Sequence, residues 1–174
     1  RWSTIAPDTA NNVLGAFIKG ARLTRENAGH ALSFQVSLHS TDHGQRVRHT
    51  GVNRLISVED IAAASAEITG LTKRRLSLAF VLHAESVIDP NVLVKHFSPE
   101  HNIISLRPIW TSSEDHMNLP MASENILALY TELRRTWDVV YMPPNVSQEN
   151  DGRPAELDNM GPQALLGMRR QGLK

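Results

Sequence analysis

Short apolar strand candidates alternate with helix candidates along most of this chain, and this order constrains the fold more than any other feature. The strand candidates lie near residues 2–6, 32–38, 76–82, 102–108 and 138–142. Segments of helical length separate each candidate from the next, and strands joined by helices pair in parallel through right-handed crossovers. The order therefore predicts an α/β fold with five parallel strands, either an open doubly wound sheet or an arc of a barrel.

The strand predicted at residues 32–38 ends in a run of polar residues. Every second side chain within it is apolar, which is the period of a strand with one apolar face. The strand leads directly into His39, Ser40, Thr41 and Asp42, whose side chains all form hydrogen bonds readily. Loops after parallel strands meet at one edge of the sheet. We therefore expect the functional site at that edge.

Two of the intervening helices carry recognisable start and stop signals. We expect Asp8 to cap a first helix that ends at Gly20. Ser57, with Asp60 three residues later, predicts the start of another helix, which should end at Gly70. Between them, residues 43–53 are basic, contain glycine and have no clear period, so they predict a loop over the rim of the sheet.

The second half of the chain continues the pattern and then changes composition. Residues 76–82 are apolar on both parities, which is typical of a strand buried on both faces. Asp89-Pro90 predicts a short helix through His96, and Glu124 to Trp137 has the most regular helical stripe. From residue 145 onward polar residues dominate, so we divide the chain into an α/β domain at 1–144 and a polar tail at 145–174, in which residues 162–170 can form a short helix.

The glycines decide between the two sheet architectures. No glycine-rich phosphate loop follows any strand candidate, because Gly15 and Gly20 fall inside and at the end of the first predicted helix. This argues against the open sheets that bind nucleotides. We therefore predict a partial (β/α) TIM-like barrel.

Composition excludes several classes of protein. Lys and Arg total 18, as do Asp and Glu, so no net charge steers the chain to nucleic acid or to an anionic membrane. No apolar run approaches the ~20 residues that span a bilayer, so we expect no membrane partner. Cysteine is absent, which excludes disulfides, thiolate metal sites and a cysteine nucleophile within these residues. Because the sequence begins at Arg1 in register for a strand, we interpret it as a segment of a longer or processed chain. We expect it in the cytoplasm, or in an organelle matrix if a targeting peptide has been removed.

Several segments resemble the later part of the radical S-adenosylmethionine (radical SAM) barrel, especially the branch that methylates an adenine in ribosomal and transfer RNA. Ser37-Leu38-His39, at the end of an apolar strand, is similar to a motif that lines the S-adenosylmethionine pocket of that branch. Ser3-Thr4 resembles a pair at the end of an earlier strand. Further similar segments follow in the same order, namely Thr69-Gly70, residues 74–82, Val94–Phe97 and residues 102–108. The resemblance covers residues 1 to 140.

The resemblance implies a cofactor, a site and an activity. S-adenosylmethionine would be the cofactor, with Ser3, Ser37, Leu38 and His39 lining its pocket. The chain would be part of a radical SAM methyltransferase acting on adenine in rRNA or tRNA. A 4Fe-4S cluster would be present only if cysteines lie upstream, so we predict that the 174-residue segment alone is inactive; the resemblance identifies no catalytic residue within it. The branch has Pro-aromatic-Asn-Pro where this chain reads Pro108-Ile109-Trp110-Thr111, and its methyl-accepting cysteine is missing.

Other interpretations of the same residues stay open. His39 is equally explained as a rim histidine that bonds its neighbours, and the Ser3-Thr4 hydroxyls as groups that bond local backbone. His39, His43 and His49 lack the helical spacing with an acid that marks zinc hydrolases, so we predict no metal site. Ser37 lacks the flanking glycines of a hydrolase nucleophile.

The alternative function is a non-catalytic, barrel-derived binding or assembly subunit, including one in an RNA–protein complex. RNA could bind the basic residues 44–54 and 73–75, although such runs are also typical of a solvated face. An arc without its first strands leaves one sheet edge open. We expect missing chain or a partner subunit to cover that edge.

Overall fold

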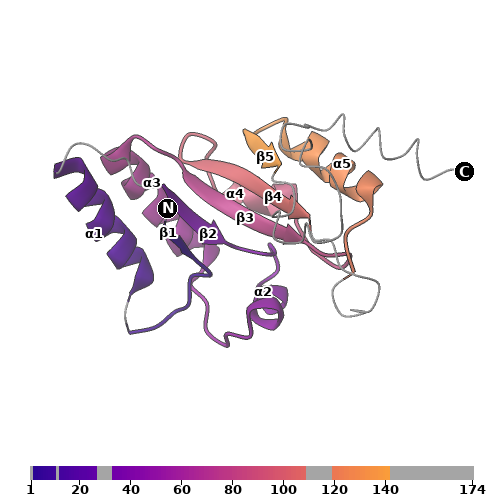
Figure 1. Ribbon diagram of the computed structural model, residues 1–174, viewed down its shortest axis with the longest axis horizontal. Helices are drawn as coiled ribbons and strands as arrows, with labels where there is room; N and C mark the ends of the chain where they lie inside the picture. Colours follow the sequence, from indigo (N-terminus) through magenta and orange to yellow (C-terminus); the bar gives the residue numbers. More distant parts are fainter. Residues whose placement is uncertain (1, 11, 27–32, 109–118, 142–174) are drawn as a thin grey trace, which may run out of the picture.

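Five parallel strands form one sheet in the computed structural model, which describes residues 2–10, 12–26, 33–108 and 119–141 (Figure 1). The strands lie in sequence order: β1 (Trp2–Thr4), β2 (Phe34–Ser37), β3 (Leu76–Leu82), β4 (Asn102–Pro108) and β5 (Val139–Tyr141). All four neighbouring pairs are parallel. The prediction of five parallel strands alternating with helices is therefore confirmed.

Helices connect each strand to the next. They are α1 (Val13–Glu26), α2 (His43–Thr50), α3 (Val58–Thr72), α4 (Pro90–His96) and α5 (Ser123–Leu133). The β2–β3 connection holds two of them, and Figure 1 shows α2 set apart from α1 and α3. None of the helices in the described ranges has the length and apolar character needed to cross a lipid bilayer.

One face of the sheet is apolar and carries the core. Val36, Leu78, Ile104 and Val139 lie side by side across β2 to β5, and all four are buried. Helices α1, α3, α4 and α5 contribute to the same cluster with, among others, Phe17, Ile61, Leu93, Ile126 and Leu133. Because all four helices share one core with this face, they cover one side of the sheet, as in an arc of a barrel.

The opposite face carries most of the polar side chains of the sheet, beside apolar Ala79, Val81 and Ile103. Successive strand residues point to opposite faces, which places Gln35, Ser37, Ser77, Ser105 and Arg107 on this side. The Arg107 Nη2 atom donates to Gln35 Oε1 at 3.1 Å, so the pair joins β4 to β2 across the intervening β3. This face is therefore where side chains of different strands form hydrogen bonds across the sheet.

The first helix departs from its prediction at both ends. Asp8 does not cap it but pairs with Arg54 at 2.8 Å, and Asn12 Oδ1 instead accepts the Gly15 amide at 3.0 Å. The helix also continues through Gly20 to Glu26. A Cβ atom at Gly20 would lie 2.5 Å from Cζ3 of Trp2, so this glycine permits the close approach of the indole rather than ending the helix.

The basic segment predicted as a loop contains helix α2. Asp42 caps it by accepting the Gln45 amide at 2.6 Å, and Gly51 ends it with φ 66°. For α3, Ser57 is the cap as predicted, because its Oγ accepts the Asp60 amide at 3.0 Å. That helix passes Gly70 and ends at Thr72.

The later elements agree more closely with their predictions. Helix α4 follows Asp89 and spans Pro90 to His96, as expected. Helix α5 ends at Leu133, four residues earlier than predicted, although Trp137 is buried at 3% exposure. Trp110 and the predicted tail at 145–174 lie outside the described residues.

Candidate functional site at the carboxyl ends of the strands

Three of the four polar residues after β2 hold the rim together. Ser40 Oγ donates to the Val87 carbonyl at 2.8 Å, and the Asp89 amide donates to Thr41 Oγ1 at 2.9 Å. The Asp42 side chain caps α2. These hydrogen bonds serve the structure of the rim. Of the four residues 39–42, His39 is the one whose side chain has no such structural role.

His39 adopts a backbone conformation that side-chain-bearing residues avoid. Its φ is 64°, and its amide donates to the Ala79 carbonyl at 3.3 Å. Such left-handed residues cluster at functional sites, where the surrounding structure holds them in place. Burial lowers the pKa of the imidazole below 6.5, and the neighbouring His49, His83 and Arg46 lower it further. His39 is therefore neutral at pH 7.

His49 on α2 and His83 after β3 complete a cluster with His39. The ring centroids of His49 and His83 are 5.0 Å apart. Burial lowers the His83 pKa, and His49 adds to the effect. The sequence drew attention to His43, but that residue is exposed at the start of α2. Within the described ranges, no group of three or more histidine, aspartate or glutamate side chains could hold a metal ion.

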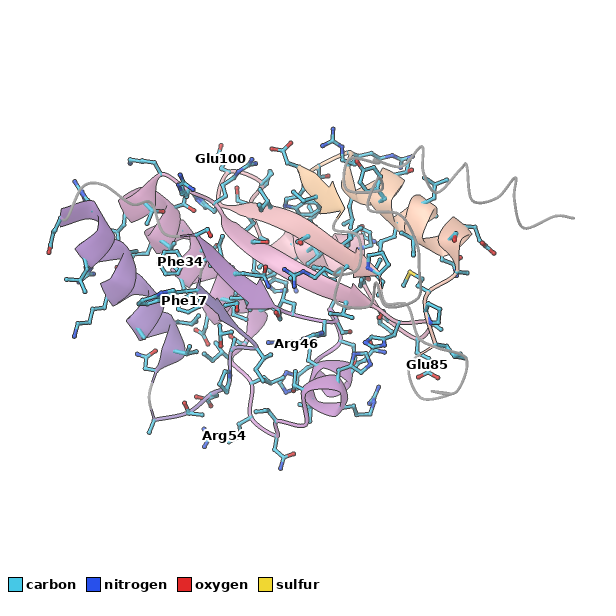
Figure 2. The ribbon with its side chains drawn as sticks, viewed as in Figure 1. Phe17, Phe34, Arg46, Arg54, Glu85 and Glu100 are labelled. Atoms are coloured by element: carbon cyan, nitrogen blue, oxygen red, sulfur yellow. The ribbon has the colours of Figure 1, made fainter. Side chains whose placement is uncertain are left out.

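Arg46 is a buried cation at the same edge (Figure 2). The side chain is 1% exposed, and its Nη1 donates to the Ile56 carbonyl at 3.1 Å. Its Nε and Nη2 atoms have no hydrogen-bond partner among the described residues. Burial lowers the pKa of the guanidinium.

Gln45 fixes the position of α2. Its side-chain Nε2 donates to the Glu85 carbonyl at 2.6 Å, and its Oε1 accepts the Val87 amide at 2.8 Å. The residue is 4% exposed. The helix that carries Arg46 and His49 is thereby held to the segment that follows β3.

The residues predicted to line a cofactor pocket fall into three positions. Ser37 is half-buried on the polar face, and its Oγ accepts a 3.4 Å bond from Gln35 Nε2, which leaves the hydroxyl proton for another acceptor. Ser3 is exposed on the edge strand β1, on the same face and beside Gln35. The Leu38 side chain is buried in the core, so only its backbone faces the rim. The local-backbone interpretation holds for Thr4, whose hydroxyl accepts the Ala6 amide at 3.0 Å.

Sequence reasoning missed Arg46, His83 and Gln45 as parts of this site. Arg46 was grouped with exposed basic residues because the segment lacks an apolar stripe. A usable signal was present, since Asp42 and Gly51 are typical of the first and last positions of a short helix. Placing a helix between them would have put Gln45, Arg46 and His49 on one turn and a half.

Comparisons with known proteins identify a similar fold. No family model matches the chain, and no curated protein matches it. Among solved structures, the chain is similar to the crystal structure of a radical SAM methyltransferase from Sphaerobacter thermophilus, with a TM-score of 0.57 and 18% sequence identity. The match covers 81% of this chain and 39% of that structure, so this chain spans well under half the length of its neighbour. The likeness confirms the predicted barrel-type α/β fold.

Proposed function

We propose that this chain forms part of the S-adenosylmethionine-binding barrel of a radical SAM methyltransferase. The observation that carries the proposal is a polar sheet face ending in Ser37 and His39, in a fold shared with a methyltransferase of that superfamily. Ligands of parallel α/β sheets bind beyond the carboxyl ends of the strands, which is where these two residues lie.

The chemistry of the rim fits the cofactor. S-adenosylmethionine presents an ammonium, ribose hydroxyls and a carboxylate, which need acceptors and donors without bulk. Ser37 can donate its hydroxyl proton, and a neutral His39 imidazole offers one donor and one acceptor. Ser3 and the Leu38 backbone would complete the pocket. When bound, the cofactor supplies the transferable group, while these residues orient it.

The iron-sulfur cluster of the superfamily does not fit these residues. Such clusters are held by cysteine thiolates, and the chain contains none. The cluster would have to be bound by chain outside this segment, or by a partner. The open edge at β1, where Trp2 and Ser3 are exposed, is where we place that additional chain.

Binding of S-adenosylmethionine tests the proposal. Calorimetry should detect binding to the protein and a loss of roughly tenfold or more in the Ser37→Ala/His39→Ala double variant, because two hydrogen-bonding groups are removed. His43→Ala, which removes an exposed imidazole of the same segment, is the matched control. Equal affinity of the double variant and the wild type would contradict the assignment.

We infer RNA as the substrate class from the resemblance of Ser37-Leu38-His39 to the RNA-methylating branch. The local cations support this only in part. Arg46 is buried, while Arg54 and Arg75 pair with acidic residues at 2.8 and 2.6 Å. Exposed Arg48, Lys73 and Arg74 remain as candidate phosphate contacts. Filter binding of an adenine-containing RNA hairpin, compared between wild type and a triple alanine variant, tests this inference.

A non-catalytic binding or assembly subunit is the second candidate function. The absence of cysteine from all 174 residues favours it, because a scaffold keeps the barrel shape without needing the cluster. The same calorimetry separates the two candidates. A protein that folds but binds no S-adenosylmethionine, alone or with its partner, supports the scaffold.

A further inference from the structure

The buried guanidinium of Arg46 presents a defined edge that the described residues do not use. Nη1 is engaged by the Ile56 carbonyl at 3.1 Å, whereas Nε and Nη2 have no partner among the described residues. These two atoms lie on the same side of the planar guanidinium, and their parallel N–H bonds match the two oxygens of a carboxylate or phosphate. The unused edge is therefore the one suited to bidentate binding of an oxyanion.

Arg46 forms no ion pair with a described carboxylate, and its neighbour His39 is a titratable imidazole. His39 is near enough to Arg46 to have its pKa lowered by it, and His49 and His83 complete the cluster. Asp42, the acidic residue nearest in sequence, caps α2 with its side chain. Burying an unpaired charge is strongly unfavourable, so proteins retain one where something else compensates it.

We propose that the Arg46 Nε–Nη2 edge, beside the cluster of His39, His49 and His83, is a binding site for an oxyanion, either a carboxylate or a phosphate. The four residues come from three separate places, namely the end of β2, helix α2 and the end of β3. Gln45 locks α2 against the segment after β3, so the cluster is held by fixed elements. Because Nε and Nη2 are buried, the anion enters by displacing the groups that cover them.

Two sources could provide the anion. One is the carboxylate of an amino-acid-like ligand, which under the proposed function is the methionine part of the cofactor. The other is a phosphate of a nucleotide. The proposal itself does not depend on methyltransferase activity, since inorganic phosphate can report on the site.

The experiment measures binding of three probes to the full chain by calorimetry. The probes are inorganic phosphate, S-adenosylhomocysteine and 5′-methylthioadenosine, which lacks the amino-acid carboxylate. We expect Arg46→Met to weaken anion binding by roughly 10- to 100-fold, because two charge-assisted hydrogen bonds are lost. Arg46→Lys, which keeps the charge but not the planar edge, should recover only part of the affinity. Arg25→Met, which removes an exposed cation from the distant helix α1, should bind like the wild type.

The pattern across the probes identifies the source. A carboxylate source predicts that S-adenosylhomocysteine binds more tightly than 5′-methylthioadenosine in the wild type and that Arg46→Met abolishes the difference. A phosphate source predicts Arg46-dependent phosphate binding with no such difference. As an independent readout, the bound anion should move the NMR titrations of the His39 and His83 imidazoles to higher pH. The proposal is overturned if no probe binds, or if Arg46→Met and Arg25→Met behave alike. Should Arg46→Met not fold, Arg46→Lys decides by the same criteria.

Discussion

At the scale of single residues, His39 combines an unusual backbone conformation with an imidazole kept neutral by its surroundings. The positive φ follows from the turn that takes the chain out of β2, where Leu38 and His39 both donate to the Ala79 carbonyl. Burial then lowers the His39 pKa, and His49, His83 and Arg46 lower it further. A neutral imidazole can both donate and accept a hydrogen bond, which suits it to a mixed ligand.

The lowered His39 pKa predicts a pH dependence of stability. The unfolded state takes up a proton near pH 6.5, whereas the folded state does so only at lower pH. Between these values the unfolded state binds more protons, so stability is full above pH 6.5 and falls as pH decreases through the folded-state pKa. The pKa of His83 is also lowered in the folded state, so this residue adds to the loss of stability at low pH. Urea unfolding from pH 8 to pH 5 should therefore show a declining free energy of unfolding.

Removal of His39 should reduce this decline. His39→Asn is the suitable variant because asparagine tolerates a positive φ, and at pH 8 we expect it to change stability by less than about 1 kcal/mol. Below pH 6.5 its free energy of unfolding should fall less steeply than that of the wild type. His43→Asn controls for the loss of any imidazole. An unchanged slope in His39→Asn would refute the explanation.

At the scale of elements, replacing two helical glycines by alanine should have opposite effects on stability, because their surroundings differ. Gly70 is exposed within α3, and a Cβ atom there would meet nothing within 4 Å. Gly70→Ala should therefore stabilise the protein by about 0.5–1 kcal/mol through helix propensity alone. At Gly20 a Cβ atom would lie 2.5 Å from the Trp2 ring, which packs against Phe17 and Phe34. Gly20→Ala should displace that ring and destabilise by about 1 kcal/mol.

A double-mutant cycle isolates the cause. In a Trp2→Ala background the obstacle at Gly20 is gone, so Gly20→Ala should become stabilising, as at Gly70. Thermal or urea unfolding of the four proteins gives a coupling energy that we expect at about 1–2 kcal/mol. If the effects of the two substitutions on stability are additive, the Trp2 indole is not the reason that residue 20 is glycine.

Helix α2 depends on one polar side chain for its position. Gln45→Ala leaves the Glu85 carbonyl and the Val87 amide without their partner, and we expect a loss of about 1–3 kcal/mol in the free energy of unfolding. Gln45→Glu should be at least as harmful, because a carboxylate oxygen would face the Glu85 carbonyl. Amide exchange in residues 43–50 should accelerate in both variants. Arg48→Ala, on the exposed side of the same helix, should change stability by less than about 0.5 kcal/mol.

The sequence predicts elements well where burial imposes a period. β2 and β3 were recognised because their apolar side chains are buried, and α3 because a serine cap precedes an apolar stripe. Helix α2 was missed because polar contacts, not an apolar stripe, hold it: its two buried side chains are Gln45 and Arg46. The end of α1 was misplaced because a glycine can serve a close approach as well as a helix stop.

The candidate site was predictable only in part for the same reason. His39 could be identified because it directly follows a strand with a clear period. His83 follows β3 in the same way but lies 44 positions later, and its closeness to His49 depends on the register of the sheet and the placement of α2. The unused Arg46 edge results from burial, which composition cannot reveal. Contacts between distant segments are set by packing and are not written in any single segment.

At the scale of the whole molecule, the sheet is covered by helices on one face and carries most of its polar groups on the other. The two edge strands β1 and β5 each have three residues, and an open parallel edge is a site for further pairing. The similar methyltransferase structure is covered by the match over only 39% of its length. We propose that more strands, from additional chain or from a partner subunit, continue the arc at these edges.

The last prediction concerns chemistry: the 174-residue chain alone should not cleave S-adenosylmethionine. Cleavage in the radical SAM superfamily needs a 4Fe-4S cluster held by cysteine thiolates, and this chain has none. The clustered histidines do not substitute for them, since no set of three potential metal-binding side chains occurs in the described ranges. After anaerobic iron-sulfur reconstitution, 5′-deoxyadenosine should not exceed a no-protein control, even if calorimetry detects bound S-adenosylmethionine. Release above that control would show that the chain assembles a working cluster without cysteine. It would refute the proposal that chain outside this segment, or a partner, binds the cluster.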